Sequence, residues 1–308
     1  MTDVAAVATA ATAEPTPVAL TVQGPGGSKR RGKRGGKLGI GGWLCLLWLV
    51  LVTVSAILAP ILPLKTPDDP DFLVPKNADM GTKGHLLGTD ENGYDIFSRL
   101  IWGGRVSIVI GLGVLCVGMV IGGTIGLIAG FMRGRSESLL MAVVDIFLAF
   151  PALLFLIAIV AFLGKDLVNI LIGICLVSIP YFARISRATT LSYSGREFVL
   201  AAEAAGASRK RILVREVLPN VILPMLAFGL LVVAIAIVAE GSLAFLGITD
   251  PNTISWGGMI NDGRSALQID GIAHPSLLPA LMLFLTVLAI NFLGERFRAA
   301  FDVKESML

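Results

Sequence analysis

Six long apolar blocks constrain the fold of this chain more than any other feature of its sequence. A bilayer core of about 30 Å needs a helix of roughly 17 to 25 apolar residues, and only the fourth block is clearly shorter than that. Because 55% of the 308 residues are hydrophobic and only 15% are charged, the chain is suited to lipid rather than water. We therefore predict an all-α membrane protein with six transmembrane helices, over residues 38–62, 106–131, 139–163, 167–182, 221–239 and 277–293.

The basic residues indicate how these spans are oriented. Lys and Arg gather in residues 1–37, after the second block, in residues 184–220 and in residues 295–308, which lie on one side if the spans alternate. Short cytoplasmic loops retain positive charge, so we expect both termini to be cytoplasmic. The first block is too long for the apolar region of a secretory signal and lacks a clear cleavage site, so we predict an uncleaved span.

Residues 1–37 are rich in Ala, Thr, Pro and Gly and have no apolar periodicity. They are predicted to form a disordered, basic cytoplasmic tail. A basic cluster directly before a span is typical of a topological anchor that is attracted to anionic lipid. We therefore expect membrane lipid, and not nucleic acid, as the partner of this tail.

Residue types with redox or metal chemistry show no functional pattern. Cys45, Cys116 and Cys175 all lie inside apolar blocks without a paired spacing. His85 and His274 fall in different extracytoplasmic loops and have no neighbouring ligand pattern. We predict free thiols and no metal site.

The common motifs of nucleotide-binding and hydrolytic sites are also missing. The sequence has no G-x-x-x-x-G-K-[ST] stretch and no H-E-x-x-H, and Gly241-Ser242 lacks the flanking residues of a nucleophile elbow. We therefore expect that the chain is not an enzyme, has no catalytic residues and binds neither ATP nor another cofactor itself.

Two carboxylates lie at or within predicted spans, where an ionisable residue is a functional candidate. Asp145 lies near the start of the third block and Glu240 at the end of the fifth. One interpretation is a proton relay, as in a proton-coupled secondary transporter. The interpretation that we favour is that each lies near an interface, where it stays hydrated or pairs with a neighbouring chain.

Small and helix-breaking residues predict how two blocks pack. In the second block Gly118, Gly122, Gly126 and Gly130 recur at a spacing of four and so lie close to one helical face. Small residues let helix backbones approach closely in lipid, so we predict a packing seam, either within the chain or with another subunit. In the third block Pro151 removes a backbone hydrogen bond and is expected to kink or loosen the helix.

The connection between the fourth and fifth blocks, residues 184–220, is too long and too patterned for a simple linker. Its Ala-rich first half favours a helix, and Gly206 supplies a stop. A second short helix is expected from about Ser208 to Leu218, where Pro219 forces a break before the fifth block. Two short helices joined by a glycine form an elbow suited to docking a partner. An amphipathic pair that lies on the membrane is the alternative.

This connection resembles the coupling loop of bacterial ABC importer permeases. That loop has the pattern E-A-A-x-x-x-G followed about a dozen residues later by L-P, and Leu200-Ala201-Ala202, Gly206 and Leu218-Pro219 stand at those positions. Leu200 replaces the usual Glu, and Glu203 follows three residues later. Similarities over residues 88–108, 240–258 and 291–294 narrow the resemblance to the C-type permease subunit of dipeptide and oligopeptide importers.

The resemblance implies a type I ABC importer permease fold in a bacterial inner membrane. The permease core would cover residues 106–294, with an extracytoplasmic segment at 63–105 and an extracytoplasmic loop at 241–276. The implied partners are a homologous B-type permease, two ATPase domains in one fused chain or two, and an extracytoplasmic peptide-binding protein. ATP and Mg would be bound by the ATPase partners. The residues expected to couple the permease to those partners are Leu200, Ala201, Ala202, Glu203, Gly206 and Ala207.

The extracytoplasmic segment 63–105 is notably acidic. Its carboxylates are expected either to meet basic residues of the binding protein or to stay solvated: Asp68, Asp69, Asp71, Asp79, Asp90, Glu91 and Asp95. The pattern does not identify substrate-binding residues, and permeases of this type import dipeptides, longer peptides, haem or nickel complexes. A membrane-anchored sensor or assembly factor is a further alternative, but it leaves the similarities to the permease family unexplained.

Overall fold

The computed structural model describes residues 39–305, with side chains as far as residue 300, so the tail predicted for residues 1–37 lies outside the described residues. The helices are α1 (Ile40–Leu58), α2 (Ile96–Val117), α3 (Gly123–Met132), α4 (Arg135–Leu148), α5 (Ala152–Leu163), α6 (Leu167–Tyr193), α7 (Glu197–Ala204), α8 (Arg209–Ile212), α9 (Leu218–Phe245), α10 (Trp256–Asp262) and α11 (His274–Glu305). There are also a 3-10 turn, η1 (Thr82–Gly84), and three π-helical turns, η2 (Gly118–Gly122), η3 (Leu213–Val217) and η4 (Ala266–Asp270).

Within the part of the chain that the structure describes, five helical stretches are long and apolar enough to cross a membrane, namely residues 40–58, 96–132, 167–193, 209–245 and 274–300. Helices α4 and α5 pass the same test only together, and they are bent by 81° at a short break between them. The prediction of one helix over residues 139–163 was therefore wrong. Pro151 lies in a break between two helices, and it does not merely kink one. Counted as a single broken span, α4 and α5 complete the predicted six.

Several helices extend beyond their apolar blocks. Helix α2 begins at Ile96, inside the segment predicted for residues 63–105, because the Asp95 carboxylate caps it by accepting from the backbone N–H of Ser98 at 2.7 Å. Helix α6 continues to Tyr193, so the connection predicted for residues 184–220 is shorter than expected. Likewise α11 runs through most of the predicted tail 295–308.

The prediction that Pro219 breaks the chain was wrong, because residues 209–245 form one helical stretch. The π-helical turn η3 lies directly before α9, and the carbonyl four residues before Pro219 lies within this irregular turn, which accommodates the missing N–H of the proline. The side-chain amide of Asn220 donates to the carbonyl of Glu216 at 2.6 Å. The carbonyl thus gains a donor within the irregular turn.

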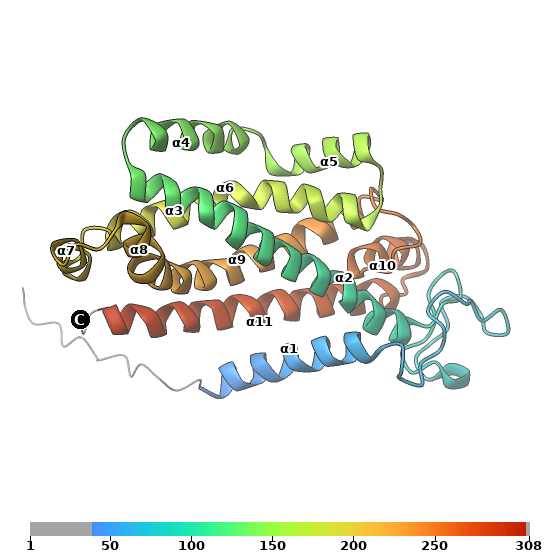
Figure 1. Cartoon of the computed structure of the whole chain (residues 1–308). Coiled ribbons are helices and arrows are strands. Elements are labelled where there is room, and N and C mark those ends of the chain that lie inside the picture. The colour runs from blue at the N-terminus through green and yellow to red at the C-terminus, as the bar shows by residue number, and fades with distance from the viewer. Residues whose placement is uncertain (1–38, 306–308) are drawn as a thin grey trace, which may run out of the picture. The chain divides into compact units, whose positions relative to one another are not determined.

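Figure 1 shows α11 between α1 and α9, and α4 and α5 along the outer side of α6. The main core lies where α2, α6 and α9 cross, and its fully buried side chains include Ile110, Val114, Phe182 and Val221. In lipid the hydrophobic effect does not drive helices together, so dispersion contacts over small residues hold such helices in place.

The glycine ladder packs against α6 of the same chain. Gly118 lies against the ring of Phe182, and a Cβ atom at Gly126 would overlap the carbonyl oxygen of Ala183. One turn away, the hydroxyl of the buried Ser186 donates to the carbonyl of Gly123 at 2.7 Å. The seam between η2, α3 and α6 is therefore an intrachain contact of two backbones, with no space for larger side chains.

Candidate functional site

The elbow, defined as residues 197–207, consists of the short helix α7 and its C-terminal cap. Gly206 adopts the left-handed conformation with φ +79°. Its N–H donates to the carbonyl of Glu203 at 2.9 Å, and the N–H of Ala207 donates to the carbonyl of Ala202 at 3.0 Å. This pair of bonds is the Schellman arrangement, which glycine favours because it has no Cβ to clash. The predicted helix stop at Gly206 is confirmed.

The elbow has an anchored face and an open face. Val199 is 2% exposed and belongs to the main core, and Ala202 and Ala207 pack against that core. On the other side Leu200 is 55% exposed, and Ala201, Glu203 and Ala204 are also exposed. The predicted coupling residues therefore divide in two: Leu200, Ala201, Glu203 and Gly206 are accessible, whereas Ala202 and Ala207 fix the elbow to the spans.

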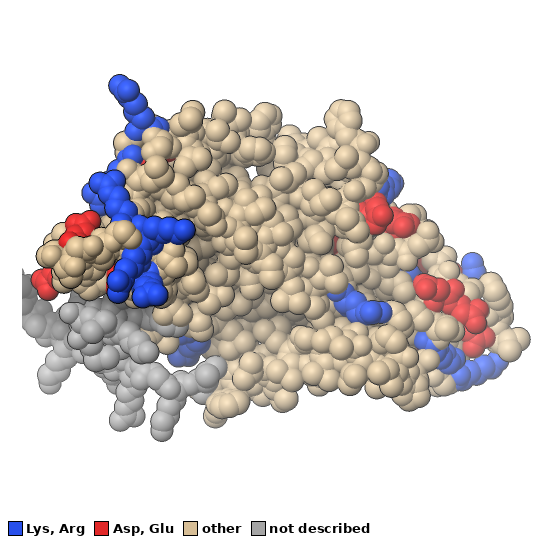
Figure 2. Space-filling model, viewed as in Figure 1, with Lys and Arg blue, Asp and Glu red and all other residues tan. Residues whose placement is uncertain are grey.

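Basic side chains flank the elbow. The hydroxyl of Ser208 caps α8 by accepting from the N–H of Arg211 at 3.4 Å, and Arg209, Lys210 and Arg211 are exposed. Figure 2 shows Lys and Arg gathered over this end of the protein, while the middle of the same face is largely free of charge. The buried Ile212 and Val217 hold the start of the helical stretch of residues 209–245 in the core.

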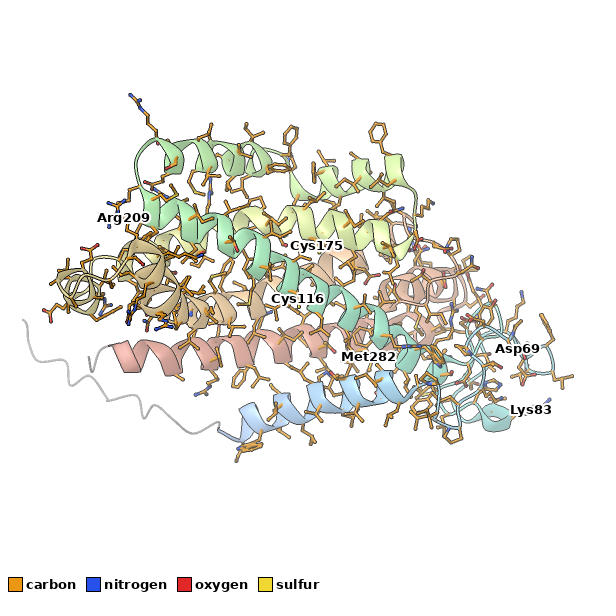
Figure 3. The ribbon with its side chains drawn as sticks, viewed as in Figure 1. Asp69, Lys83, Cys116, Cys175, Arg209 and Met282 are labelled. Atoms are coloured by element: carbon orange, nitrogen blue, oxygen red, sulfur yellow. The ribbon has the colours of Figure 1, made fainter. Side chains whose placement is uncertain are left out.

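The α1–α2 segment, residues 59–95, lies at the opposite end of the helices, as the positions of Asp69 and Lys83 relative to Arg209 show (Figure 3). Much of its acidity is used internally. Asp90 accepts from the backbone N–H groups of Asn92 and Tyr94, each at 2.9 Å, and from Arg99 Nη1 at 2.7 Å. Asp90 and Arg99 are both buried. The buried pair ties the segment to α2.

Three more of the seven acidic residues of this segment also have partners within the chain. Asp95 caps α2 and lies 2.8 Å from Nδ1 of the buried His85. Asp71 lies 3.3 Å from Nε2 of the same histidine, and Glu91 accepts from the hydroxyl of Ser265. The expectation that these seven carboxylates either meet the binding protein or stay solvated was therefore wrong for four of them, which have partners within the chain. The remaining acids, Asp68, Asp69 and Asp79, are exposed.

Two carboxylates outside the spans have shifted pKa values of opposite direction. The backbone N–H of Leu73, followed by His85 and Lys65, holds the pKa of Asp71 below its usual range. Burial raises the pKa of Asp262, although the positive charge of Arg99 opposes the shift. Asp71 is thus held ionised for its contacts with His85 and Lys65.

Helix α10 closes over the end of α9. Gly257 of α10 packs on the backbone of Gly241, and the indole N–H of Trp256 donates to the carbonyl of Leu100 in α2 at 2.8 Å. Glu240, which precedes Gly241, is only 2% exposed. The expectation that Glu240 stays hydrated at an interface was therefore wrong, because its side chain is buried inside the protein.

Asp145 has a different environment from Glu240. Its Oδ1 lies 2.6 Å from Arg184 Nη2 of α6, and both side chains are 57% exposed. Asp145 thus has a pairing partner within its own chain. Sequence reasoning did not identify Arg184 as a partner, because it assigned residue 184 to the connection after the fourth block and not to a helix beside Asp145.

Comparisons with known proteins agree on one family. The family model described as binding-protein-dependent transport system inner membrane component matches residues 122–305. The glutathione transport system permease protein GsiD of Pectobacterium atrosepticum is 38% identical over 224 residues, which cover 72% of this chain and 74% of the relative. The di/tripeptide transport system permease protein DppC of Pseudomonas aeruginosa is 39% identical over 264 residues, which cover 84% and 86%.

A solved structure supports the fold. The MetNI methionine ABC transporter, in an inward-facing conformation, contains a chain that matches with a TM-score of 0.55 and 18% sequence identity. The match covers 66% of this chain and 96% of that one. At this identity the likeness concerns the fold alone, and that fold is the type I importer permease.

Proposed function

The chain belongs to the family of binding-protein-dependent transport system inner membrane components, and on that basis we propose that it is a C-type permease subunit that forms half of the pathway of an ATP-driven peptide importer. The observation that carries the proposal is the elbow, a short helix with a rigid glycine cap, one buried face and one exposed face. It lies directly before the long helix of residues 209–245.

The names of the relatives support a peptide substrate. They are described as permeases for glutathione, for di- and tripeptides and for dipeptides, and all of these solutes are short peptides. Haem or nickel complexes remain the alternative within the family. A proton-coupled transporter built on Asp145 and Glu240 is less well supported, because one carboxylate is paired and exposed while the other is buried inside the protein.

The proposed assembly contains partners for the second half of the pathway, for ATP hydrolysis and for peptide capture. We propose a homologous B-type permease, two ATPase domains that bind ATP and Mg, and a peptide-binding protein. The ATPase domains dock on the open face of the elbow, on the cytoplasmic side, where both termini of the chain also lie. The binding protein approaches the α1–α2 segment on the other side. Closure of the ATPase domains moves the elbow, which requires that the two states differ in their ATP contacts.

A substitution on the open face tests the docking role. We expect Ala201→Arg to reduce co-purification of the ATPase partners and peptide uptake at least about tenfold, because an exposed, small docking residue is replaced by a bulky charge. Gly195→Ala is the matched control, since a Cβ atom at Gly195 meets no atom within 4 Å. Unchanged ATPase recovery and unchanged uptake in Ala201→Arg would exclude the elbow as the docking site.

A further inference from the structure

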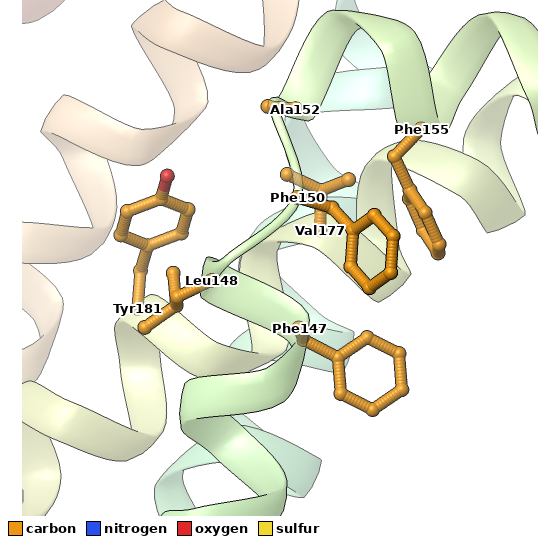
Figure 4. Close-up of a pocket in the computed structure, with 7 residues that line it drawn as sticks. All are labelled: Phe147, Leu148, Phe150, Ala152, Phe155, Val177 and Tyr181. Carbon is orange, nitrogen blue, oxygen red and sulfur yellow. The ribbon is translucent and has the colours of Figure 1, made fainter.

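Two cavities within the described residues differ in size and in lining. The pocket at the break between α4 and α5 has a volume of about 10 Å³, which is enough for one water molecule. Figure 4 shows that its labelled side chains are apolar except for the hydroxyl of Tyr181. The second cavity, which we name the α10 cavity, has a volume of about 100 Å³ and several polar side chains in its lining. Only the second of these two is large enough for a side chain to move into it.

The α10 cavity lies at the end of the protein where α9, α10 and the start of α2 meet (Figure 1). Its lining includes Thr249 and Thr253 of the loop before α10, and Gly258 and Asp262 of α10 itself. Arg99 of α2 also lines it. The cavity is thus bounded by α10 and by a buried guanidinium of another helix.

Arg99 uses only part of its hydrogen-bonding capacity. Its Nη1 donates to Asp90 at 2.7 Å, and its Cζ lies 4.5 Å from the centre of the Tyr94 ring. Its Nε is shielded from solvent and has no hydrogen-bond partner among the described residues. A buried donor without a partner is unfavourable, and such donors are rare in folded proteins. Arg99 therefore holds the α1–α2 segment with one nitrogen and keeps a second donor unpaired.

The acceptor that could satisfy this donor lies across the cavity lining, on α10. Asp262 Oδ2 is 3.8 Å from Arg99 Nη1, which is beyond hydrogen-bond distance. Burial raises the pKa of Asp262, Arg99 opposes that shift, and the negative charge of Asp90 adds to it. A closer approach to the guanidinium would stabilise the ionised carboxylate and pair the buried Nε at the same time.

Helix α10 is packed tightly on two sides and loosely toward the cavity. A Cβ atom at Gly257 would overlap the backbone of Gly241 in α9, and one at Gly263 would overlap the backbone of Pro275 in α11. A Cβ atom at Gly258, which lines the cavity, would meet other groups only at an ordinary 3.6 Å or more. The direction with free space is therefore toward the cavity, and a displacement of the end of α9 carries α10 with it.

We propose that α10 is a latch that closes onto Arg99 when the ATPase domains close, so that the α10 cavity collapses and Asp262 accepts a hydrogen bond from Arg99 Nε. This inference rests on the proposed function, in which movement of the elbow reaches the helical stretch of residues 209–245. Asp90 holds Arg99 Nη1 in both states, which keeps the guanidinium in place to receive Asp262. Arg99 and Asp262 are thus positioning residues, which select between two placements of α10.

Filling the cavity tests whether transport needs this space. Gly258→Leu places a large side chain in the cavity, and we expect ATP-driven uptake of dialanine by the assembled transporter to fall at least about tenfold. Gly258→Ala is the matched control, because one methyl group leaves most of the cavity open, and its uptake should stay within about twofold of the wild type. Uptake by Gly258→Leu at the level of Gly258→Ala would overturn the proposal.

Variants of Asp262 separate a latch from a static contact. We expect Asp262→Ala to lower uptake about fivefold, because closure loses its acceptor. The melting temperature should change by less than about 2 °C, because the pair makes no hydrogen bond in the state described. Asp262→Asn keeps an acceptor for Arg99 Nε and should retain most of the uptake. A matching loss of thermal stability, or an equal loss of uptake in both variants, would contradict the latch.

Thiol labelling follows the cavity directly. Cys45, Cys116 and Cys175 are replaced by alanine, and Asn261→Cys is introduced in the cavity lining. We expect trapping with ATP and vanadate to slow its reaction with a small, membrane-impermeant thiol reagent at least about tenfold. Ile269→Cys, at a position that is 80% exposed, is the control and should react at an unchanged rate.

Two outcomes of the labelling experiment would overturn the proposal. Unchanged labelling of Asn261→Cys after trapping would show that the cavity does not close. Protection by the extracytoplasmic binding protein alone, without nucleotide, would show that a docked partner fills the cavity instead. Recovery of the ATPase partners is measured for every variant, so that failure of the latch is distinguished from failure of the importer assignment.

Discussion

Two of the interfaces that helix α6 makes within the chain contrast with each other. Toward η2 and α3 it packs backbone on backbone, and added Cβ atoms at Gly118, Gly122 and Gly126 would all overlap its atoms. Toward α4 and α5 it makes two ion pairs and leaves a pocket. The first interface has no space for an added side chain, whereas the second leaves space and exposed polar groups. A single helix thus has one close-packed interface and one interface with exposed polar groups.

The largest expected effect comes from filling the tight interface. Gly126→Val should destabilise the protein by about 3 kcal/mol or more, because the new side chain overlaps the carbonyl oxygen of Ala183 and Ser186 Cβ. The free energy of unfolding in detergent micelles measures the effect. Gly41→Ala is the control, since its Cβ would meet the ring of Phe292 at an ordinary 3.5 Å. If both variants were equally stable, the seam would not be the rigid side of α6.

An intermediate effect is expected from the ion pair that joins α4 to α6. Glu137 is 16% exposed and lies 2.5 Å from Arg187 Nη2. Glu137→Gln should cost about 1 kcal/mol of unfolding free energy, because a charge-assisted bond becomes a neutral one at a partly exposed site. The same unfolding assay measures it. A loss as large as that of Gly126→Val would show that α4 is held as tightly as α3.

The smallest effect is expected at the break itself. Phe150 is 58% exposed, and its ring contacts that of Phe155 with centroids 6.3 Å apart. Phe150→Ala should change the unfolding free energy by only about 0.5 kcal/mol, which is the low end for an aromatic pair. A loss of several kcal/mol would mean that the pocket is a packed core element and would erase the contrast between the two faces of α6.

The sequence predicted features that depend on local spacing. The four-residue spacing of the glycines predicted a seam, and the Ala-rich stretch before Gly206 predicted a short capped helix. Both follow from helical periodicity and from the conformational freedom of glycine. The identity of the partner helix did not follow, because spacing within one helix carries no information about the opposing surface.

Prolines and acids show why the remaining features could not be predicted. Pro151 lies in a break, whereas Pro180 and Pro219 both lie within helical stretches. The outcome depends on whether an adjacent turn or side chain replaces the lost hydrogen bond, and that is decided by tertiary contacts. In the same way, the sequence indicates an acid on the surface at Asp90, whereas in the structure Asp90 forms a buried ion pair with Arg99.

The continuous helix of residues 209–245 has a mechanical consequence. Its 37 residues span about 55 Å at 1.5 Å per residue, from just beyond the elbow to the residues covered by α10. Near its middle, Gly229 lies against Leu115 and Phe182. If partner ATPase domains displace the elbow, we expect this helix to turn about its packed middle, so that its two ends move in opposite directions.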